Sequence, residues 1–163
     1  MKRKLTHLDR RGRVRMVDVG HKPVTARQAL AEGFIVLQPA TLRAIADAAV
    51  PKGEVLGTAR VAGILAAKQC GTLIPLCHPL PVESVDVDFD LPALDPPARR
   101  QGVRLRIKAT ARIHARTGVE MEALTAVCVA ALTIYDMCKA IDKTMVIEGV
   151  RLLKKTGGTS API

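Results

Sequence analysis

T-G-V-E-M-E-A-L-T-A-V-C-V-A-A-L-T-I-Y-D-M-C-K-A-I, residues 117–141, is the stretch around which we expect the fold to be organised. Thr117-x-x-Glu120 has the spacing of a capping box, in which each side chain bonds a backbone N–H of the first helical turn. The Ala, Leu and Met that follow favour a helix. No residue from Ala123 to Tyr135 is charged, and this run is shorter than the ~20 residues a bilayer requires. The pattern therefore predicts a core helix, buried nearly all round, and not a membrane span.

Two charged residues lie near the end of this apolar helix. Asp136 and Lys139 are three positions apart, which on an exposed helix indicates an ordinary ion pair contributing roughly 0.2–0.5 kcal/mol. Their neighbours are largely apolar, so we expect desolvation to couple the two titrations. A lysine beside a carboxylate in a closed site is a plausible proton-transfer pair. We therefore regard Asp136 and Lys139 as candidate catalytic residues.

Composition limits the class of protein. The 163 residues are enough for one domain with a substantial core, with residues 1–23 irregular and 156–163 a flexible tail. The formal charge of +10 suggests an anionic partner. Aromatic residues make up only 2%, which argues against the stacking that grips single-stranded nucleic acid. The four cysteines form no CxxC pattern and no secretory signal segment is recognisable, so we expect a reducing cytoplasm and no membrane.

Hydrophobic patterning predicts four strands and three helices. Residues 83–91 and 103–113 alternate between apolar and charged side chains, the first run acidic and the second basic, as in neighbouring antiparallel strands. The resulting order, β-α-α-β-β-α-β, is a ferredoxin-like split β-α-β with one inserted helix. This is an α+β fold, a four-stranded antiparallel sheet with helices on one face. The other sheet face is then either solvated or covered by another subunit. The remaining predicted elements are strands at 24–37 and 145–154 and helices from Pro39 to about Ala49 and from about Glu54 to Cys70.

Several other polar groups could take part in binding, each with a simpler structural explanation. Three prolines within 75–81 predict a stiff loop around Cys77-His78. A core thiol beside a histidine bonded to a carbonyl explains that pair, and the cysteine spacing fits no common structural zinc pattern, so we assign no metal ligand. Lys52-Gly53 and Lys154-Lys155 have the composition of phosphate-binding loops, although loop lysines are often only solvated. Glu120 and Glu122 also suit the positive end of a helix without any further role.

Three long blocks resemble the signature blocks of the cyclic pyranopterin monophosphate synthases, the molybdenum cofactor biosynthesis protein C family. They are L-I-P-L-C-H-P-L at 73–80, G-V-E-M-E-A-L-T at 118–125 and A-A-L-T-I-Y-D-M-C-K-A at 130–140. L-T-H-L at 5–8, M-V-D-V at 16–19, K-G-E-V at 52–55 and V-R-L-L-K-K-T-G-G at 150–158 agree with them. The resemblance covers nearly the whole chain. It departs in the loop 92–101 and in the tail, where the family commonly continues Gly-Gly-Lys-Ser-Gly and this chain has G-G-T-S-A.

The resemblance implies an enzyme that converts 3′,8-cyclo-7,8-dihydroguanosine 5′-triphosphate into cyclic pyranopterin monophosphate and releases pyrophosphate. It also implies a hexamer built as a trimer of dimers, with sites at subunit interfaces. No redox cofactor is expected, and whether Mg²⁺ accompanies the triphosphate is left open. Asp136 and Lys139 fall on the family's catalytic Asp and Lys, and we group Lys52 with them. The positions that fall on its substrate contacts are Cys77, His78, Glu120, Met121, Glu122 and Lys155.

Two other classes of function are weighed beside the synthase. The charge of +10 suits a nucleic-acid-binding module, whose affinity would fall steeply with salt. A zinc hydrolase using Cys77 and His78 is a weaker hypothesis. The scarcity of aromatic residues, and the expected placing of Asp136 and Lys139 on a buried helix, argue against nucleic acid.

Helix geometry adds one expectation. At about 100° per residue, Glu122, Leu132 and Asp136 share one face of the central helix, but Glu122 and Asp136 are roughly 21 Å apart along the axis. One nucleotide does not easily bridge that length on a single helix. If both ends serve one site, two copies of the helix should lie antiparallel across a two-fold axis, in contact through side chains such as Leu132.

Overall fold

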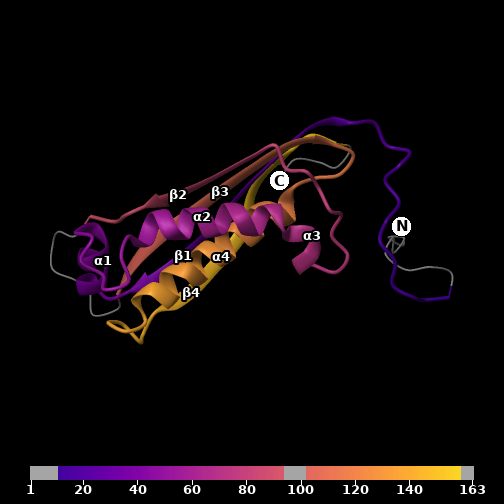
Figure 1. Ribbon diagram of the computed structural model, residues 1–163. Coiled ribbons are helices and arrows are strands. Elements are labelled where there is room, and N and C mark those ends of the chain that lie inside the picture. Colours follow the sequence, from indigo (N-terminus) through magenta and orange to yellow (C-terminus); the bar gives the residue numbers. More distant parts are fainter. Residues whose placement is uncertain (1–10, 94–101, 159–163) are drawn as a thin grey trace.

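A four-stranded sheet carries helices on one face in the computed structural model, which describes residues 11–93 and 102–158 (Figure 1). The sheet order is β2-β3-β1-β4 and every neighbouring pair is antiparallel. This order and the helix placement agree with the predicted α+β, ferredoxin-like arrangement. The elements are β1 (Thr25–Leu37), α1 (Pro39–Ala46), α2 (Val55–Lys68), α3 (Cys70–Leu73), β2 (Ser84–Asp90), β3 (Val103–Ala115), α4 (Glu120–Cys138) and β4 (Val146–Thr156).

The predicted pairing of an acidic strand with a basic strand is confirmed. Asp90 lies opposite Arg106 and Asp88 opposite Lys108 in the antiparallel register of β2 and β3. Val87 and Ile107, each next to one of these charged positions, point to the other face and are buried. Alternation with a period of two therefore fixes both the register and the face that meets the helices.

Helices α2 and α4 run side by side over the sheet (Figure 1). They approach closely at Gly63, where an added Cβ would lie 2.9 Å from the carbonyl oxygen of Ala126. Ala130, Ala131 and Ile134 of α4 are fully buried. By length and composition alone α4 could cross a membrane, but it is the core helix, as predicted. Its burial is incomplete on one side, because Leu132 is 57% exposed.

A charged cluster stabilises the outer face of the sheet, opposite the helices. Glu32 of β1 is only 2% exposed and accepts hydrogen bonds from Arg106 Nε at 2.7 Å and from Arg151 Nε at 2.8 Å. Burial alone would raise the pKa of Glu32, but the hydrogen bonds and charges of Arg151 and Arg106 outweigh it and leave the pKa lowered. The carboxylate is therefore ionised and links β3, β1 and β4.

Two local predictions are wrong. Helix α4 begins at Glu120 with Val119 as its N-cap and no side-chain cap, so Thr117 and Glu120 form no capping box. Glu120 pairs with Lys155 of β4, a distant partner that the local pattern does not contain. The helix predicted from about Glu54 to Cys70 is confirmed as α2, but its predicted end is wrong, because α2 stops at Lys68 and Cys70 starts the separate α3. The irregular character of residues 11–23 is confirmed, whereas the motif at 5–8 and most of the loop 92–101 and the tail lie outside the described residues.

Candidate active site

The three predicted catalytic residues meet at the C-terminal end of α4. Asp136 lies between two lysines, with Oδ1 2.7 Å from Lys139 Nζ and Oδ2 2.7 Å from Lys52 Nζ. Lys52 also donates a hydrogen bond of 2.9 Å to the main-chain oxygen of Asp136. The Lys52 ammonium therefore binds the Asp136 carboxylate and also neutralises the negative C-terminal end of the helix dipole.

The turn that follows α4 is tied to the start of α1. Asp142 is buried and accepts hydrogen bonds from the Gln38 N–H at 2.8 Å and the Thr41 hydroxyl at 3.1 Å. It also accepts a hydrogen bond from the Thr144 N–H at 2.9 Å. The Asp142 carboxylate thus joins α1 to the turn after α4. Lys52 lies in the loop that follows α1, and Lys139 lies just before that turn.

The expected desolvation of Asp136 and Lys139 is wrong for the single chain. The side chains of both residues are 56% exposed, and that of Lys52 is 44% exposed. The pKa of Asp136 is lowered to about 2, first by the hydrogen bond from Lys139 and then by that from Lys52. The pKa of Lys139 is raised by its hydrogen bond to Asp136. The two titrations are therefore coupled by direct contact in solvent and not by burial.

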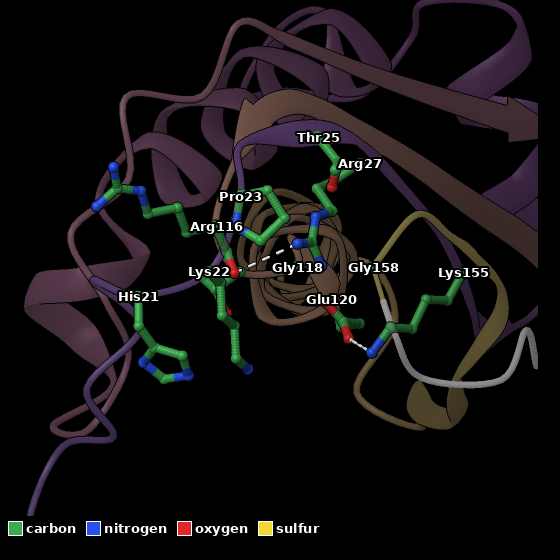
Figure 2. Close-up of a pocket in the computed structure, with 11 residues that line it drawn as sticks. His21, Lys22, Pro23, Thr25, Arg27, Arg116, Gly118, Glu120, Lys155 and Gly158 are labelled. Carbon is green, nitrogen blue, oxygen red and sulfur yellow. Dashed lines mark hydrogen bonds and ion pairs between the residues drawn. The ribbon is translucent and has the colours of Figure 1, made fainter.

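Other predicted substrate contacts gather at the opposite end of α4. Glu120 pairs with Lys155 across the gap between α4 and β4 (Figure 2). Their side chains are 24% and 19% exposed respectively. Met121, the next residue of the helix, is 38% exposed. The N-terminal end of α4 therefore presents one neutralised ion pair and one accessible apolar side chain.

Glu122 is a buried carboxylate with spare hydrogen-bonding capacity. It is 1% exposed, its Oε1 lies 3.7 Å from Cys77 Sγ, and its Oε2 has no partner among the described residues. Burial is the main cause that raises the pKa of Glu122. Burial, and next the charge of Glu122, raise the pKa of Cys77 to about 12. Burial therefore shifts both groups towards their protonated forms.

His78 is oriented by the N-terminal segment. Its Nε2 lies 2.9 Å from the carbonyl oxygen of Val17, the arrangement expected for a histidine bonded to a carbonyl. Cys77 lies close to Cys70 and Glu122, and the possible metal-ligand atoms of these three side chains all lie within 4.8 Å of one another. Cys70, which is not among the predicted site residues, thus also lies near the site.

Two cavities lie at this end of α4. One of about 440 Å³ is lined by Cys77, His78, Glu120 and Met121. A neighbouring one of about 520 Å³ shares Glu120 and includes Lys155. Figure 2 shows the residues that line the second cavity, among which Arg27 and Lys155 lie near Glu120 and the Arg116 guanidinium points away from them. The basic residues lining it that the sequence did not single out are Lys22, Arg27 and Arg116.

The two arginines are held in place by main-chain oxygens. Arg27 Nη2 donates to the carbonyl of Arg116 at 3.3 Å, and Arg116 Nη1 donates to that of Gly20 at 2.8 Å. With Lys155 nearby, Arg27 makes the second cavity suitable for an anionic group. No local motif marks Arg27 and Arg116, because they come from the start of β1 and the residue after β3.

The predicted site residues therefore form two groups on one chain. Asp136, Lys139 and Lys52 lie at the C-terminal end of α4, and the other six lie at its N-terminal end. Glu122 and Asp136 are fourteen positions apart on one continuous helix, which corresponds to roughly 21 Å at about 1.5 Å per residue.

Known proteins resemble this chain over nearly its whole length. A family model described as the MoaC family matches residues 16–158. The chain belongs to the MoaC family. It is similar to the cyclic pyranopterin monophosphate synthase of Chloroflexus aggregans, with 59% identity over 156 residues, covering 96% of this chain and 90% of the relative.

Two further relatives of this MoaC-family chain carry the same kind of name. The cyclic pyranopterin monophosphate synthase of Roseiflexus castenholzii is 54% identical over 159 residues, covering 98% of this chain and 96% of the relative. Cyclic pyranopterin monophosphate synthase 1 of Mycobacterium tuberculosis is 54% identical over 156 residues, covering 96% and 87% respectively. Family membership favours the predicted enzyme over the nucleic-acid-binding alternative.

Proposed function

We propose that this protein is a cyclic pyranopterin monophosphate synthase of molybdenum cofactor biosynthesis. It would convert 3′,8-cyclo-7,8-dihydroguanosine 5′-triphosphate into cyclic pyranopterin monophosphate and pyrophosphate. Beyond family membership, the proposal rests most on Asp136, whose two carboxylate oxygens each lie 2.7 Å from a lysine ammonium. This arrangement places an acid–base pair next to two cations that can bind phosphate.

The three charged residues take different parts in this proposal. Asp136 and Lys139 move protons as the purine-derived ring opens and closes again. Lys52 neutralises charge that builds on phosphate oxygens in the transition state. Because Asp136 holds both lysines in the free protein, the substrate phosphates replace the carboxylate as partner of at least one of them.

The opposite end of α4 is proposed to bind the base. A purine edge offers N–H donors, and Glu122 Oε2 is an acceptor without a partner among the described residues. Cys77, which lies beside Glu122, and His78 border the cavity of about 440 Å³, and Met121 offers an apolar contact. Glu120 and Lys155 complete the wall, where Lys155 is a cation available to the substrate once it exchanges partners.

We further propose that the active enzyme is a homo-oligomer with shared sites, a hexamer formed as a trimer of dimers. One nucleotide does not easily connect two groups roughly 21 Å apart on one helix. Two α4 helices packed antiparallel across a two-fold axis would bring the Glu122 end of one subunit to the Asp136 end of its partner. Leu132, 57% exposed between these ends, would then be covered.

The rearrangement involves no net redox change, so we propose that it needs no resident redox cofactor in its cytoplasmic setting. Whether Mg²⁺ accompanies the triphosphate is decided by adding Mg²⁺ to chelator-treated protein. The direct test of the function supplies the cyclised nucleotide to purified protein and measures pyrophosphate and the pterin product. Near wild-type turnover in both Asp136→Asn and Lys139→Ala would refute the catalytic assignment.

A further inference from the structure

We propose that Cys70, Cys77 and Glu122 form a binding site for a thiophilic divalent cation such as Zn²⁺, and that this cation inhibits the enzyme. The three side chains come from α3, from the loop after it and from α4. Their ligand atoms all lie within 4.8 Å of one another. Sulfur and carboxylate ligands in such a group suit zinc and its softer analogues.

The distances match a tetrahedral metal. A zinc ion with Zn–S bonds of ~2.3 Å places two thiolates about 3.8 Å apart, and a thiolate and a carboxylate oxygen about 3.6 Å apart. Cys70 Sγ and Cys77 Sγ are 3.8 Å apart, and Cys77 Sγ and Glu122 Oε1 are 3.7 Å apart. Two edges of the coordination polyhedron therefore exist before any ion enters.

The carboxylate supplies an independent observation. Glu122 is 1% exposed, and its Oε2 lacks a hydrogen-bond partner in the described part of the chain. A buried carboxyl oxygen left without a partner is costly. A cation bonded to Glu122 would remove that cost, as would a hydrogen-bond donor of the substrate.

Access and charge balance complete the site. Cys77 lines the cavity of about 440 Å³, from which an ion enters and from which water supplies a fourth ligand. Binding replaces the thiol protons of Cys70 and Cys77, which pass to solvent, together with any proton on Glu122. Two thiolates and one carboxylate then surround a doubly charged ion.

Inhibition follows from shared residues, and this part rests on the proposed function. Cys77 and Glu122 are proposed to contact the purine base, so a bound cation and the substrate exclude each other. Cys70 is buried behind them and touches Thr125, with Sγ and Oγ1 3.5 Å apart. We therefore assign Cys70 to the metal site and not to the substrate site.

Cadmium tests the binding directly. Reduced, chelator-treated protein is titrated with Cd²⁺ while thiolate-to-metal charge-transfer absorption is recorded. We expect one ion per chain, and Cys70→Ser should weaken binding by more than the ~10–100-fold typical of losing an outer-shell partner. Cys128→Ser is the matched control, because Cys128 lies on α4 outside the cluster, and it should bind like the wild type.

Three results would overturn the site. They are an absence of charge-transfer absorption in the wild type, unchanged affinity in Cys70→Ser, and only two titratable thiols of four per chain in denatured, unreduced protein. The last would mean that Cys70 and Cys77 are joined as a disulfide. Cys70→Ala is measured beside Cys70→Ser, with thermal melting of both, so that loss of binding is not mistaken for loss of folding.

Turnover tests the inhibition separately. Zn²⁺ should raise KM for the cyclised nucleotide in the wild type and in Cys128→Ser, and Cys70→Ser should retain activity while losing this inhibition. Zinc that binds without competing with substrate would refute the shared-ligand argument. If the uninhibited protein forms no pterin at all, the proposed function fails, and the cadmium titration still decides the metal site.

Discussion

Lys52 and Asp136 are 84 positions apart in the sequence, yet Lys52 Nζ lies 2.7 Å from Asp136 Oδ2 and 2.9 Å from the main-chain oxygen of Asp136. The loop between α1 and α2 thus delivers a cation to the last turn of α4, where the helix dipole is negative. Asp136 also holds Lys139, so both lysines are positioned before substrate arrives.

We expect Asp136→Asn to lower kcat by roughly 10²–10⁴-fold, the range typical of lost general acid–base catalysis. Lys52→Ala should raise KM as well, because it removes a phosphate contact. The assay is pyrophosphate release from the cyclised nucleotide. Asp86→Asn is the matched control, an exposed carboxylate paired with Arg112 on the sheet, and it should leave both constants near their wild-type values.

The lowered pKa of Asp136 predicts the pH range in which its ion pairs with the two lysines are lost. Hydrogen bonds from Lys139 and Lys52 hold this pKa at about 2, so the carboxylate is ionised at every pH above the ordinary value of 3.8. Any contribution of these pairs to stability is complete above that value and is lost as the pH falls towards 2. NMR titration of the Asp136 side-chain carboxyl carbon in the free protein measures this directly.

Two variants identify the cause of that shift. Lys139→Ala should move the Asp136 midpoint further towards 3.8 than Lys52→Ala, because the hydrogen bond from Lys139 is the larger cause. A wild-type midpoint above about 4 would show that the carboxylate does not contact both lysines in solution.

Much of the fold follows from local patterns. The strict alternation at 83–91 and 103–113 predicts β2 and β3 to within two residues, because each strand has one buried face and one charged face. Pro39 marks the start of α1, since proline fits the first helical turn. The capping box fails because the carboxylate of Glu120 finds Lys155, a partner set by tertiary packing and absent from the local sequence.

Less of the site than of the fold can be predicted from the sequence. Motif resemblance identifies the residues at both ends of α4, but spacing does not reveal that Cys70 joins Cys77 and Glu122. Arg27 and Arg116 have no motif, since their cavity forms only where β1, β3 and β4 meet the helix. The predicted burial of Asp136 is also wrong, because an uncharged helix need not bury the residues just beyond its apolar run.

Glu32→Gln should lower the free energy of unfolding by about 1.5–3 kcal/mol at pH 7, the range for hydrogen bonds to charged groups. The folded pKa of Glu32 is lowered, so its contribution is complete above the ordinary value of 4.5 and is lost as the pH falls through the folded pKa. Denaturant unfolding at pH 7 and pH 3 should therefore show a smaller difference between variant and wild type at pH 3. Glu148→Gln breaks the exposed pair with Arg104 and should cost less than about 1 kcal/mol at either pH.

Leu132→Lys should weaken self-association if α4 packs on a second α4. Leu132 is 57% exposed in the single chain, and burying a lysine ammonium at a helix interface is costly. Leu132→Met keeps volume and polarity nearly constant and should assemble like the wild type. Sedimentation equilibrium measures both variants, and an unchanged mass for Leu132→Lys would place the contact between subunits elsewhere.

The shared-site geometry makes its sharpest prediction for mixed subunits. Glu122→Ala removes the base-binding end of a site, and Asp136→Asn removes the acid–base end, so each protein alone should be nearly inactive. In a heterodimer, one site receives both altered ends and the other receives two intact ends. Random assortment of equal amounts makes half the dimers mixed, so about one quarter of the wild-type sites should be recovered.

The measurement is pyrophosphate release after co-refolding, with exchange between differently tagged subunits verified by affinity capture. If the tags show exchange and the mixture stays as inactive as its parents, each site is built from a single chain, and the two ends of α4 must serve different purposes.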